Sequence, residues 1–228
     1  MSQIITKIDT NRSIPPIDYS APEKIETLTC ALGCFWGPDC KFGVMEGVVR
    51  TRVGYAGGTT KDPTYHNLGD HIETVQIDYN PEKISFEELL DIFWNSHKPT
   101  RTVWKRQYAP ALFFHNEHQE KLARETRDEI SSNLSEKVQT EIVFFDKFYM
   151  AEMYHQKYHL QGYEELMAEY RHIYPSLGDF VNSTSAARVN GFIGGYGDIA
   201  QFEEEFPLLG LSADKVVFLK DIIDRNKR

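Results

Sequence analysis

The order of short apolar segments and amphipathic segments limits the possible folds of this chain. Runs of β-branched or alternating apolar residues favour strands, and apolar residues at helical spacing favour helices. Such segments follow as strand, helix, strand, strand, helix, strand, helix, strand over residues 27–32, 38–46, 48–55, 72–79, 85–93, 109–115, 116–133 and 139–145. This order predicts an α/β (α+β) fold, a two-layer sandwich with a mixed or antiparallel sheet and a ferredoxin-like core with additions.

Three parts are expected along the 228 residues, a length that can bury a sizeable core. Residues 1–24 carry three prolines and few periodic apolar positions, which predicts a flexible, extended arm. The α/β domain is expected at residues 25–162. Residues 163–228 are expected to form a mainly helical C-terminal extension that packs on this domain, with helices at 166–174 and 213–223.

The bulk properties exclude several kinds of partner. A net charge of −9 gives no electrostatic reason to bind nucleic acid or anionic lipid. No apolar run approaches the length of a membrane span, and residues 1–20 lack the basic start and apolar stretch of a signal peptide. Three cysteines are too few for a disulfide framework, and their spacing fails the usual zinc patterns. We therefore expect a cytoplasmic monomer with no bound metal.

The stretch Gly33-Cys34-Phe35-Trp36-Gly37 lies between the first predicted strand and the first predicted helix. Unpaired N–H groups and the positive dipole end of a helix favour a thiolate over a thiol, so Cys34 is a candidate nucleophile. The two aromatic residues are expected to form an apolar wall beside its sulfur. An isolated cysteine is more often an inert buried residue, but the glycines and the helix start reduce the weight of that alternative.

Glu73 is the second candidate for chemistry. It shares one face of the predicted 72–79 strand with Val75 and Ile77. Partial desolvation among these apolar neighbours is expected to raise the pKa of its carboxyl group. A glutamate considered alone is more often a solvated surface acid.

The stretch around Cys34 resembles the active-site motif of peptide methionine sulfoxide reductases of the A class. The resemblance covers about residues 25–162 and continues, in the family's order, through the segments 53–58, 63–65, 71–73, 107–108 and 148–156. Six motifs in order are far more specific than one. The resemblance implies that residues 25–162 form the catalytic domain of an enzyme that reduces the S epimer of methionine sulfoxide, free or in proteins.

The resemblance also implies roles for individual residues. Cys34 would attack the sulfoxide sulfur and become a sulfenic acid, while Glu73 would donate a proton to the oxygen. Tyr65 and Tyr108 would hydrogen-bond that oxygen as negative charge develops on it. Residues expected at the substrate-binding part of the site are Phe35, Trp36, His71, Tyr149, Glu152 and His155. The structural alternative for Tyr65 and Tyr108 is that they are packing residues. The alternative for Tyr149, Glu152 and His155 is that they belong to a short polar helix near the surface.

The chain departs from the family pattern in three places. Val103 falls where many members carry an aspartate that helps to organise the site, and Lys105 or Arg106 is available as a compensating donor. Asp70 precedes His71 where glycine is usual. The segment 191–197 resembles the family's glycine-rich tail, with Ile193 where many members hold a resolving cysteine.

Recycling of the sulfenic acid is expected to require an external thiol. On an extended strand the Cα of Cys30 would lie about 13 Å from that of Cys34, which exceeds the reach of a disulfide. Cys40 would pair with Cys34 only if the intervening helical turns unwound. We therefore expect no bound cofactor, and thioredoxin or glutathione with glutaredoxin as the reductant.

Two other classes of function are alternatives to the reductase. Val103 and the absent tail cysteine suggest a catalytically weakened module that binds methionine sulfoxide or senses peroxide through Cys34. Retention of Cys34, Glu73, Tyr65 and Tyr108 argues against that hypothesis. A thiol-disulfide oxidoreductase is disfavoured because the sequence has no Cys-x-x-Cys pair.

Overall fold

A single mixed sheet forms the centre of the α/β domain. The structure, a computed structural model, describes residues 14–19 and 22–226. Six strands among these residues pair in the order β5-β4-β1-β3-β2-β6. Their bounds are β1 Glu26–Ala31, β2 Val48–Ala56, β3 Ile72–Tyr79, β4 Ala111–Phe114, β5 Glu141–Phe144 and β6 Phe148–Met150. All neighbouring strands are antiparallel except β4 and β5, which are parallel.

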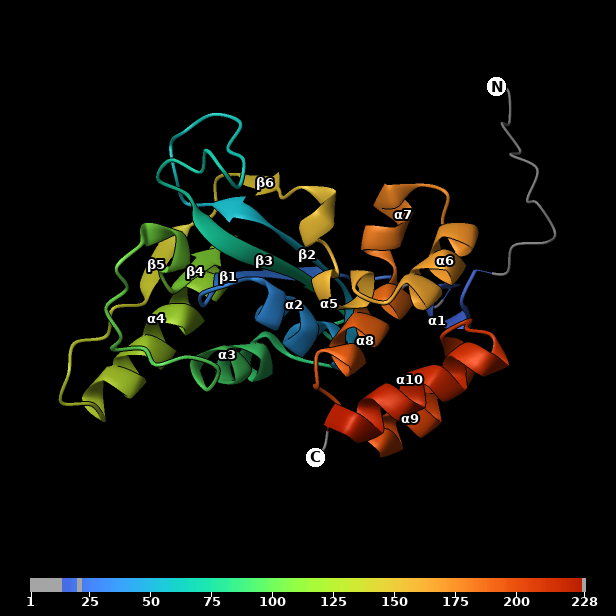
Figure 1. The fold of residues 1–228 in the computed structure, drawn as a ribbon. Helices are drawn as coiled ribbons and strands as arrows, with labels where there is room; N and C mark the ends of the chain where they lie inside the picture. Colours follow the sequence, from blue (N-terminus) through green and yellow to red (C-terminus); the bar gives the residue numbers. More distant parts are fainter. Residues whose placement is uncertain (1–13, 20–21, 227–228) are drawn as a thin grey trace, which may run out of the picture.

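The inner order β4-β1-β3-β2 is the predicted ferredoxin-like core, to which β5 and β6 add one strand at each edge. Three helices lie along one face of this sheet (Figure 1): α2 Trp36–Gly43, α3 Phe86–Trp94 and α4 Glu117–Ser132. The predicted capping box is present at α3, where Ser85 and Glu88 bond to each other's backbone N–H groups. The two-layer α/β fold predicted from the sequence is therefore confirmed.

The second face of β3 is more buried than its alternating pattern predicts. Asp78 was expected on the more polar face, yet its side chain is only 4% exposed. Arg50 and Arg52 of the neighbouring strand β2 donate to its two carboxylate oxygens at 2.6 and 2.9 Å. Charge pairing across the strands therefore covers this face where solvent was expected.

The C-terminal helices build a second apolar core beside the sheet (Figure 1). They are α6 Glu164–Ile173, α7 Leu177–Asn182, α8 Thr184–Ile193, α9 Ile199–Glu205 and α10 Ala213–Asn226, with α5 Tyr158–Gln161 leading into them. Val44, directly after α2, and Leu160 of α5 belong to this core. The extension and the α/β domain therefore share buried residues.

Two segments differ from the expected arm and from the surface helix that was the structural alternative for residues 149–156. Residues 1–13 and 20–21 of the predicted arm lie outside the described residues, but Pro16–Tyr19 forms the short helix α1 where extended chain was expected. Its Asp18 accepts a hydrogen bond from the backbone N–H of Ser185 at 3.0 Å, which ties α1 to the extension. Residues 148–156 form β6 and the 3₁₀ turn Met153–His155, because β6 pairs with the edge of β2.

The segment 191–197, which resembles the family's glycine-rich tail, begins inside a buried helix. Residues 184–193 form the helix α8, which packs directly against α2. A Cβ atom added to Gly191 would lie 2.7 Å from the carbonyl oxygen of Cys40 and 2.6 Å from the Cβ of Val44. The glycine is therefore required by the close approach of two helices.

A buried ion pair fastens these parts to one another. The Lys157 Nζ lies 3.0 Å from a carboxylate oxygen of Asp39 in α2, and the two side chains are 0% and 1% exposed. Lys157 also donates to the carbonyl oxygen of Thr51 in β2 at 2.6 Å. Asn190 of α8 donates to the second carboxylate oxygen of Asp39 at 3.1 Å. One carboxylate thus connects α2, β2, α5 and α8.

Across residues 14–19 and 22–226, every helix is too short or too polar to cross a bilayer.

Replacing Lys157 with methionine is expected to destabilise the protein by about 3–5 kcal/mol, because it leaves the buried Asp39 carboxylate uncompensated. Chemical denaturation measures the free energy of unfolding. The double variant Asp39→Asn, Lys157→Met is expected to recover part of the loss. Lys220→Met, which removes an exposed lysine paired with Glu203, is the matched control and should change little. A Lys157→Met protein as stable as this control would contradict the assignment.

Gly191→Ala is expected to lower the free energy of unfolding by about 1–3 kcal/mol, because the added methyl group overlaps the α2 backbone. Gly178→Ala in α7 is the control, since its Cβ would meet only the Ser176 hydroxyl at 3.5 Å. Equal stability of the two variants would show that α8 has room to move away from α2.

Candidate active site

The turn between β1 and α2 presents Cys34 to solvent. Gly33 has φ +107°, a left-handed backbone conformation that side chains disfavour, and it directs the chain from β1 into α2. Cys34 follows as an exposed, free cysteine. Phe35 occupies the N-cap position of α2 without a side-chain capping hydrogen bond. The sequence correctly predicted a cysteine at a helix start.

The predicted lowering of the Cys34 pKa is wrong for this structure. Surrounding atoms withdraw the sulfur from water, which raises the pKa of the thiol. A hydrogen bond from the Trp36 backbone N–H opposes this effect, and the nearby Glu73 carboxylate adds to it. The helix start therefore supplies the expected donor, but desolvation and a neighbouring negative charge outweigh it.

Glu73 is buried directly beneath this turn, with 1% of its surface exposed. One carboxylate oxygen accepts a hydrogen bond from the Phe35 N–H at 3.1 Å, and the other accepts one from the Gln107 amide at 2.6 Å. Burial raises the pKa of Glu73, and these two hydrogen bonds only partly oppose the increase. The raised pKa agrees with the sequence prediction.

Tyr108 lies near the Glu73 carboxyl group and contacts Tyr65. Tyr108 ends the 3₁₀ turn Arg106–Tyr108, whose Gln107 bonds to Glu73. Desolvation, the negative charge of Glu73 and a hydrogen bond with Tyr65 raise the pKa of Tyr108 to about 12. The charge of Cys34 contributes in the same direction. The four residues expected to carry the chemistry therefore influence one another electrostatically.

Glu152 holds the loop that carries Tyr65. Its carboxylate accepts hydrogen bonds from the Tyr65 backbone N–H at 3.0 Å and from the Tyr55 hydroxyl at 2.7 Å. Burial would raise its pKa, but these two hydrogen bonds outweigh burial and lower the pKa of Glu152. Glu152 is therefore a negatively charged residue that holds the Tyr65 loop in place. Its hydrogen bonds indicate this structural role and not the expected contact with substrate.

An aromatic cluster surrounds the start of α2. Phe35 is buried with its ring edge against His155, the ring centres 5.1 Å apart. Trp36 stacks on Tyr158 at 3.5 Å, and its indole N–H donates to Nδ1 of His155 at 3.2 Å. The proton of the neutral imidazole is therefore on Nε2, which is buried without a partner among the described residues. Burial also lowers the pKa of His155, which keeps the ring neutral.

The sequence reasoning did not select Tyr158 or Gln107 as site residues. Gln107 directly precedes Tyr108 in a recognised motif, so that motif already held the signal for it. Tyr158 follows His155 by three residues, and such spacing alone does not reveal a stacking partner for Trp36.

His71 and Tyr149 support a loop and do not reach Cys34 through any described contact. The Gly58 N–H donates to Nδ1 of His71 at 3.2 Å, and Nε2 contacts the Thr60 carbonyl oxygen at 2.7 Å. Both ring nitrogens are thus used by the backbone of residues 58–60. The rings of Tyr149 and His71 pack edge to face, and the Lys147 ammonium group lies over the Tyr149 ring. The expected substrate contact of His71 is corrected to a structural role, because its donor and acceptor are both occupied.

Val103 lies where many family members carry an aspartate, and the contacts of its neighbours show whether any of them compensates for that carboxylate. Val103 packs on an apolar cluster that includes Ala31 and Ala109. Arg106 bonds through both terminal nitrogens to Glu141 and donates to the Asp70 carbonyl oxygen, so it anchors the turn before Tyr108. Lys105 lies over the Trp104 ring at 4.7 Å. Neither cation is directed to the Cys34 sulfur by a described contact, so the idea of a compensating donor finds no support.

The other two cysteines are buried. Cys30 lies in β1, and burial raises the pKa of its thiol. Cys40 donates to the Asn190 carbonyl oxygen at 3.2 Å, and burial raises its pKa also. All three cysteines are free thiols.

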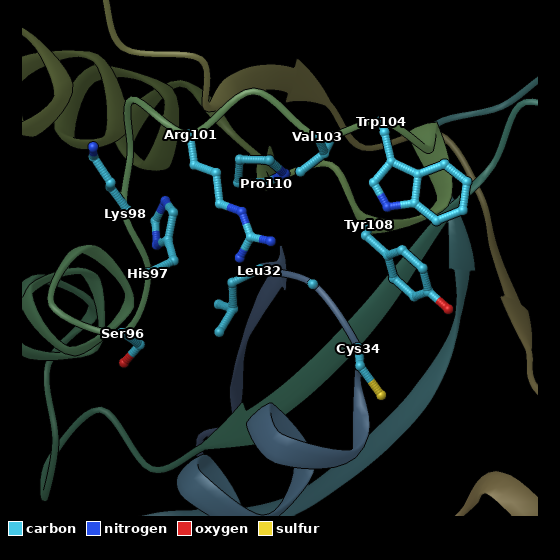
Figure 2. A pocket seen from close by; sticks show the side chains of 11 residues that line it. Leu32, Cys34, Ser96, His97, Lys98, Arg101, Val103, Trp104, Tyr108 and Pro110 are labelled. Carbon is cyan, nitrogen blue, oxygen red and sulfur yellow. The ribbon is translucent and has the colours of Figure 1, made fainter. Parts of the chain in front are cut away.

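A cavity of about 370 Å³ opens beside Cys34 (Figure 2). Its lining comes from the turn after β1, the segment after α3 and the segment before β4. It includes Cys34 and Tyr108 but excludes Glu73, Tyr65 and Trp36. Cys34 and Tyr108 are therefore accessible from this cavity.

Comparison with known proteins identifies two matching sequence families. Residues 26–186 match the family described as peptide methionine sulfoxide reductase. Residues 179–224 match the helical domain of selenoprotein methionine sulfoxide reductase A. The second match lies over α7 to α10, which agrees with a helical unit at the C-terminus.

Individual relatives support the same assignment. A peptide methionine sulfoxide reductase of Drosophila melanogaster is 41% identical over 203 residues, which cover 88% of this chain and 81% of the relative. An MsrA of Methanococcoides burtonii is 39% identical over 145 residues, which cover 59% of this chain and 95% of the relative.

Solved structures share the fold. The reduced form of Mxr1 from Saccharomyces cerevisiae is similar with a TM-score of 0.58 and 30% identity, over 64% of this chain and 89% of that one. Methionine sulfoxide reductase A of Corynebacterium diphtheriae has a TM-score of 0.54 and 29% identity, over 60% of this chain and 75% of that one. On the sequence match over residues 26–186 and the shared fold, the chain belongs to the peptide methionine sulfoxide reductase family.

Proposed function

We infer that this chain reduces the S epimer of methionine sulfoxide, free and in proteins, at the expense of a thiol, and so repairs oxidised proteins. The observation that carries the inference is the exposed Cys34 thiol beside the buried Glu73, whose pKa is raised. A nucleophile and a protonated acid are the two groups that reduction of a sulfoxide needs. Family membership supports the reaction, and the S epimer follows from the A class.

In the proposed first step, the Cys34 sulfur attacks the sulfoxide sulfur while Glu73 donates a proton to the sulfoxide oxygen. The oxygen then passes to Cys34, which becomes a sulfenic acid, and methionine leaves. Methionine sulfur gains two electrons and Cys34 sulfur loses two, so the step balances without a further oxidant. Protonation of Glu73 also removes the negative charge that raises the Cys34 pKa, so the acid form of Glu73 favours the thiolate.

The neighbouring side chains would stabilise and orient this step. The hydroxyl groups of Tyr65 and Tyr108 would donate to the oxygen as charge develops on it, and the raised pKa of Tyr108 keeps its proton available. Phe35 and Trp36, stacked on Tyr158, would enclose the methyl group of the substrate. Glu152, Tyr149, His71 and His155 would act from behind, by holding the loops and rings.

The sulfenic acid must then be reduced by a thiol from outside the chain, because Cys30 and Cys40 are both buried. We propose thioredoxin, or glutathione with glutaredoxin, as this reductant. Three free thiols fit a reducing compartment, and we propose that the enzyme acts in the cytoplasm as a monomer.

Glu73→Gln is expected to slow the first turnover by about 100-fold, because the substitution removes the proton donor. Since the pKa of Glu73 is raised, wild-type turnover should persist above the ordinary range of a carboxyl group and then fall as rising pH ionises it. Rapid-quench measurement of methionine formation across pH checks both effects. The falling limb should be absent in Glu73→Gln. An unchanged rate and pH profile would exclude Glu73 as the acid.

Cys34→Ser is expected to abolish methionine formation from either epimer of a methionine sulfoxide peptide, with dithiothreitol as donor. Cys40→Ser, its matched control, should keep multiple turnovers, because the external thiol does the recycling. Loss of turnover in Cys40→Ser with the first turnover intact would instead make Cys40 the resolving cysteine. Binding of the peptide by an inactive wild type would favour a reader or sensor of oxidised methionine.

A further inference from the structure

Apart from Cys34 and Tyr108, the residues that line the cavity beside Cys34 have no role in the proposed sulfoxide chemistry. Its wall is formed by residues 32–34, by Ser96, His97 and Lys98 after α3, and by Arg101, Val103, Trp104, Tyr108 and Pro110 (Figure 2). Its volume of about 370 Å³ lies within the range of pockets for small molecules. Because Cys34 is one of the lining residues, a ligand of moderate size in this cavity would lie next to Cys34.

Arg101 gives this cavity an uncompensated positive charge. Figure 2 shows its side chain extending from the loop into the cavity towards Leu32, with His97 on one side and Tyr108 on the other. The guanidinium group makes no ion pair or hydrogen bond with the part of the chain that the structure describes. Lys98 lies at the margin and is 3.5 Å from Glu136. The ring nitrogens of His97 contact Phe93 and Thr140, and burial lowers its pKa, so this ring is neutral.

A thiol from outside needs a route to oxidised Cys34. On the proposed function, each turnover leaves a sulfenic acid at Cys34. The side chains of Cys30 and Cys40 are fully buried, and Cys40 is held by Asn190. The cavity is lined by Cys34 and provides such a route.

We propose that this cavity binds a small thiol that carries carboxylate groups, with Arg101 as the residue that binds a carboxylate. The thiol sulfur attacks the sulfenic acid of Cys34, a disulfide forms between the two sulfurs, and the hydroxyl group leaves with a proton as water. A second thiol molecule then attacks the bound thiol's sulfur, which releases Cys34 as a thiol and yields a disulfide of the two small molecules. This inference rests on the proposed function only for the source of the sulfenic acid.

Two physical arguments favour a carboxylate ligand. A guanidinium group matches a carboxylate in a two-bond arrangement and is always charged. The chain as a whole has a net charge of −9, which repels an anionic thiol, so a local positive charge is needed to retain one beside Cys34. A neutral thiol gains nothing from Arg101, and this difference makes the proposal testable.

The test compares glutathione with neutral dithiothreitol as donors for the full chain and for Arg101→Gln. We expect kcat/KM for glutathione to fall about tenfold, while kcat/KM for dithiothreitol and KM for the sulfoxide peptide change less than about twofold. Glutathione diethyl ester, which lacks the free carboxylates, should be used equally well by both proteins. Lys220→Gln in α10 removes the same charge from an exposed site in the C-terminal helices and should keep the wild-type preference.

Other outcomes would overturn the proposal. An equal loss with both donors, or no loss with either, would show that Arg101 does not recognise the thiol. A change confined to KM for the sulfoxide would assign Arg101 to a carboxylate of the substrate.

A second measurement separates this proposal from the reductase function. Hydrogen peroxide converts Cys34 to its sulfenic acid without any sulfoxide, and mass spectrometry then follows the glutathione adduct. Arg101→Gln should slow adduct formation about tenfold, even if the chain failed to reduce methionine sulfoxide. Equal rates in wild type and Arg101→Gln would refute the cavity as the thiol site whatever the sulfoxide assay shows.

Discussion

The buried carboxylate of Asp39 is the point on which the arrangement of the molecule depends. A charge with almost no solvent exposure must be neutralised and fully hydrogen-bonded, or the fold loses several kcal/mol. Lys157 supplies the opposite charge and a backbone N–H, and Asn190 supplies a side-chain amide. The Lys157 backbone is left-handed, with φ +50°, which places both of its donors at the same carboxylate. The helix that begins directly after Cys34 and Phe35 is thereby fixed from β2, α5 and α8 together.

This arrangement explains why the C-terminal helices are part of one packed unit with the α/β domain. Asn190 and Gly191 are neighbours on α8, and they meet α2 as a hydrogen-bond donor and as a point of close contact. In family members with a glycine-rich tail, the resemblance implies a resolving cysteine in that segment. Here residues 191–193 of the corresponding segment end the buried helix α8, which packs against α2, and the segment contains no cysteine.

The sequence predicted what depends on local pattern. The alternation in β3, the capping box at α3 and the glycines around Cys34 each determine structure over a few residues, and those elements were found. Contacts between distant segments could not be predicted: the role of Gly191 depends on α2, and that of His71 depends on the backbone of residues 58–60. The pKa of Cys34 was misjudged for the same reason, because it depends first on how closely distant segments pack around the sulfur and then on the charge of Glu73, 39 residues along the chain.

The position of Cys34 at an exposed turn then has a consequence for its chemistry. A thiol that resolves a sulfenic acid must approach the same sulfur that has just released methionine, and a single narrow site would make product and reductant compete. The cavity with Arg101 is lined by Cys34 but not by Glu73, Tyr65 or Trp36. A thiol held there would lie next to Cys34 without occupying the place of those three groups. On the proposal that the reductant comes from outside the chain, a binding place beside Cys34 matters because the thiol must arrive by diffusion in every cycle.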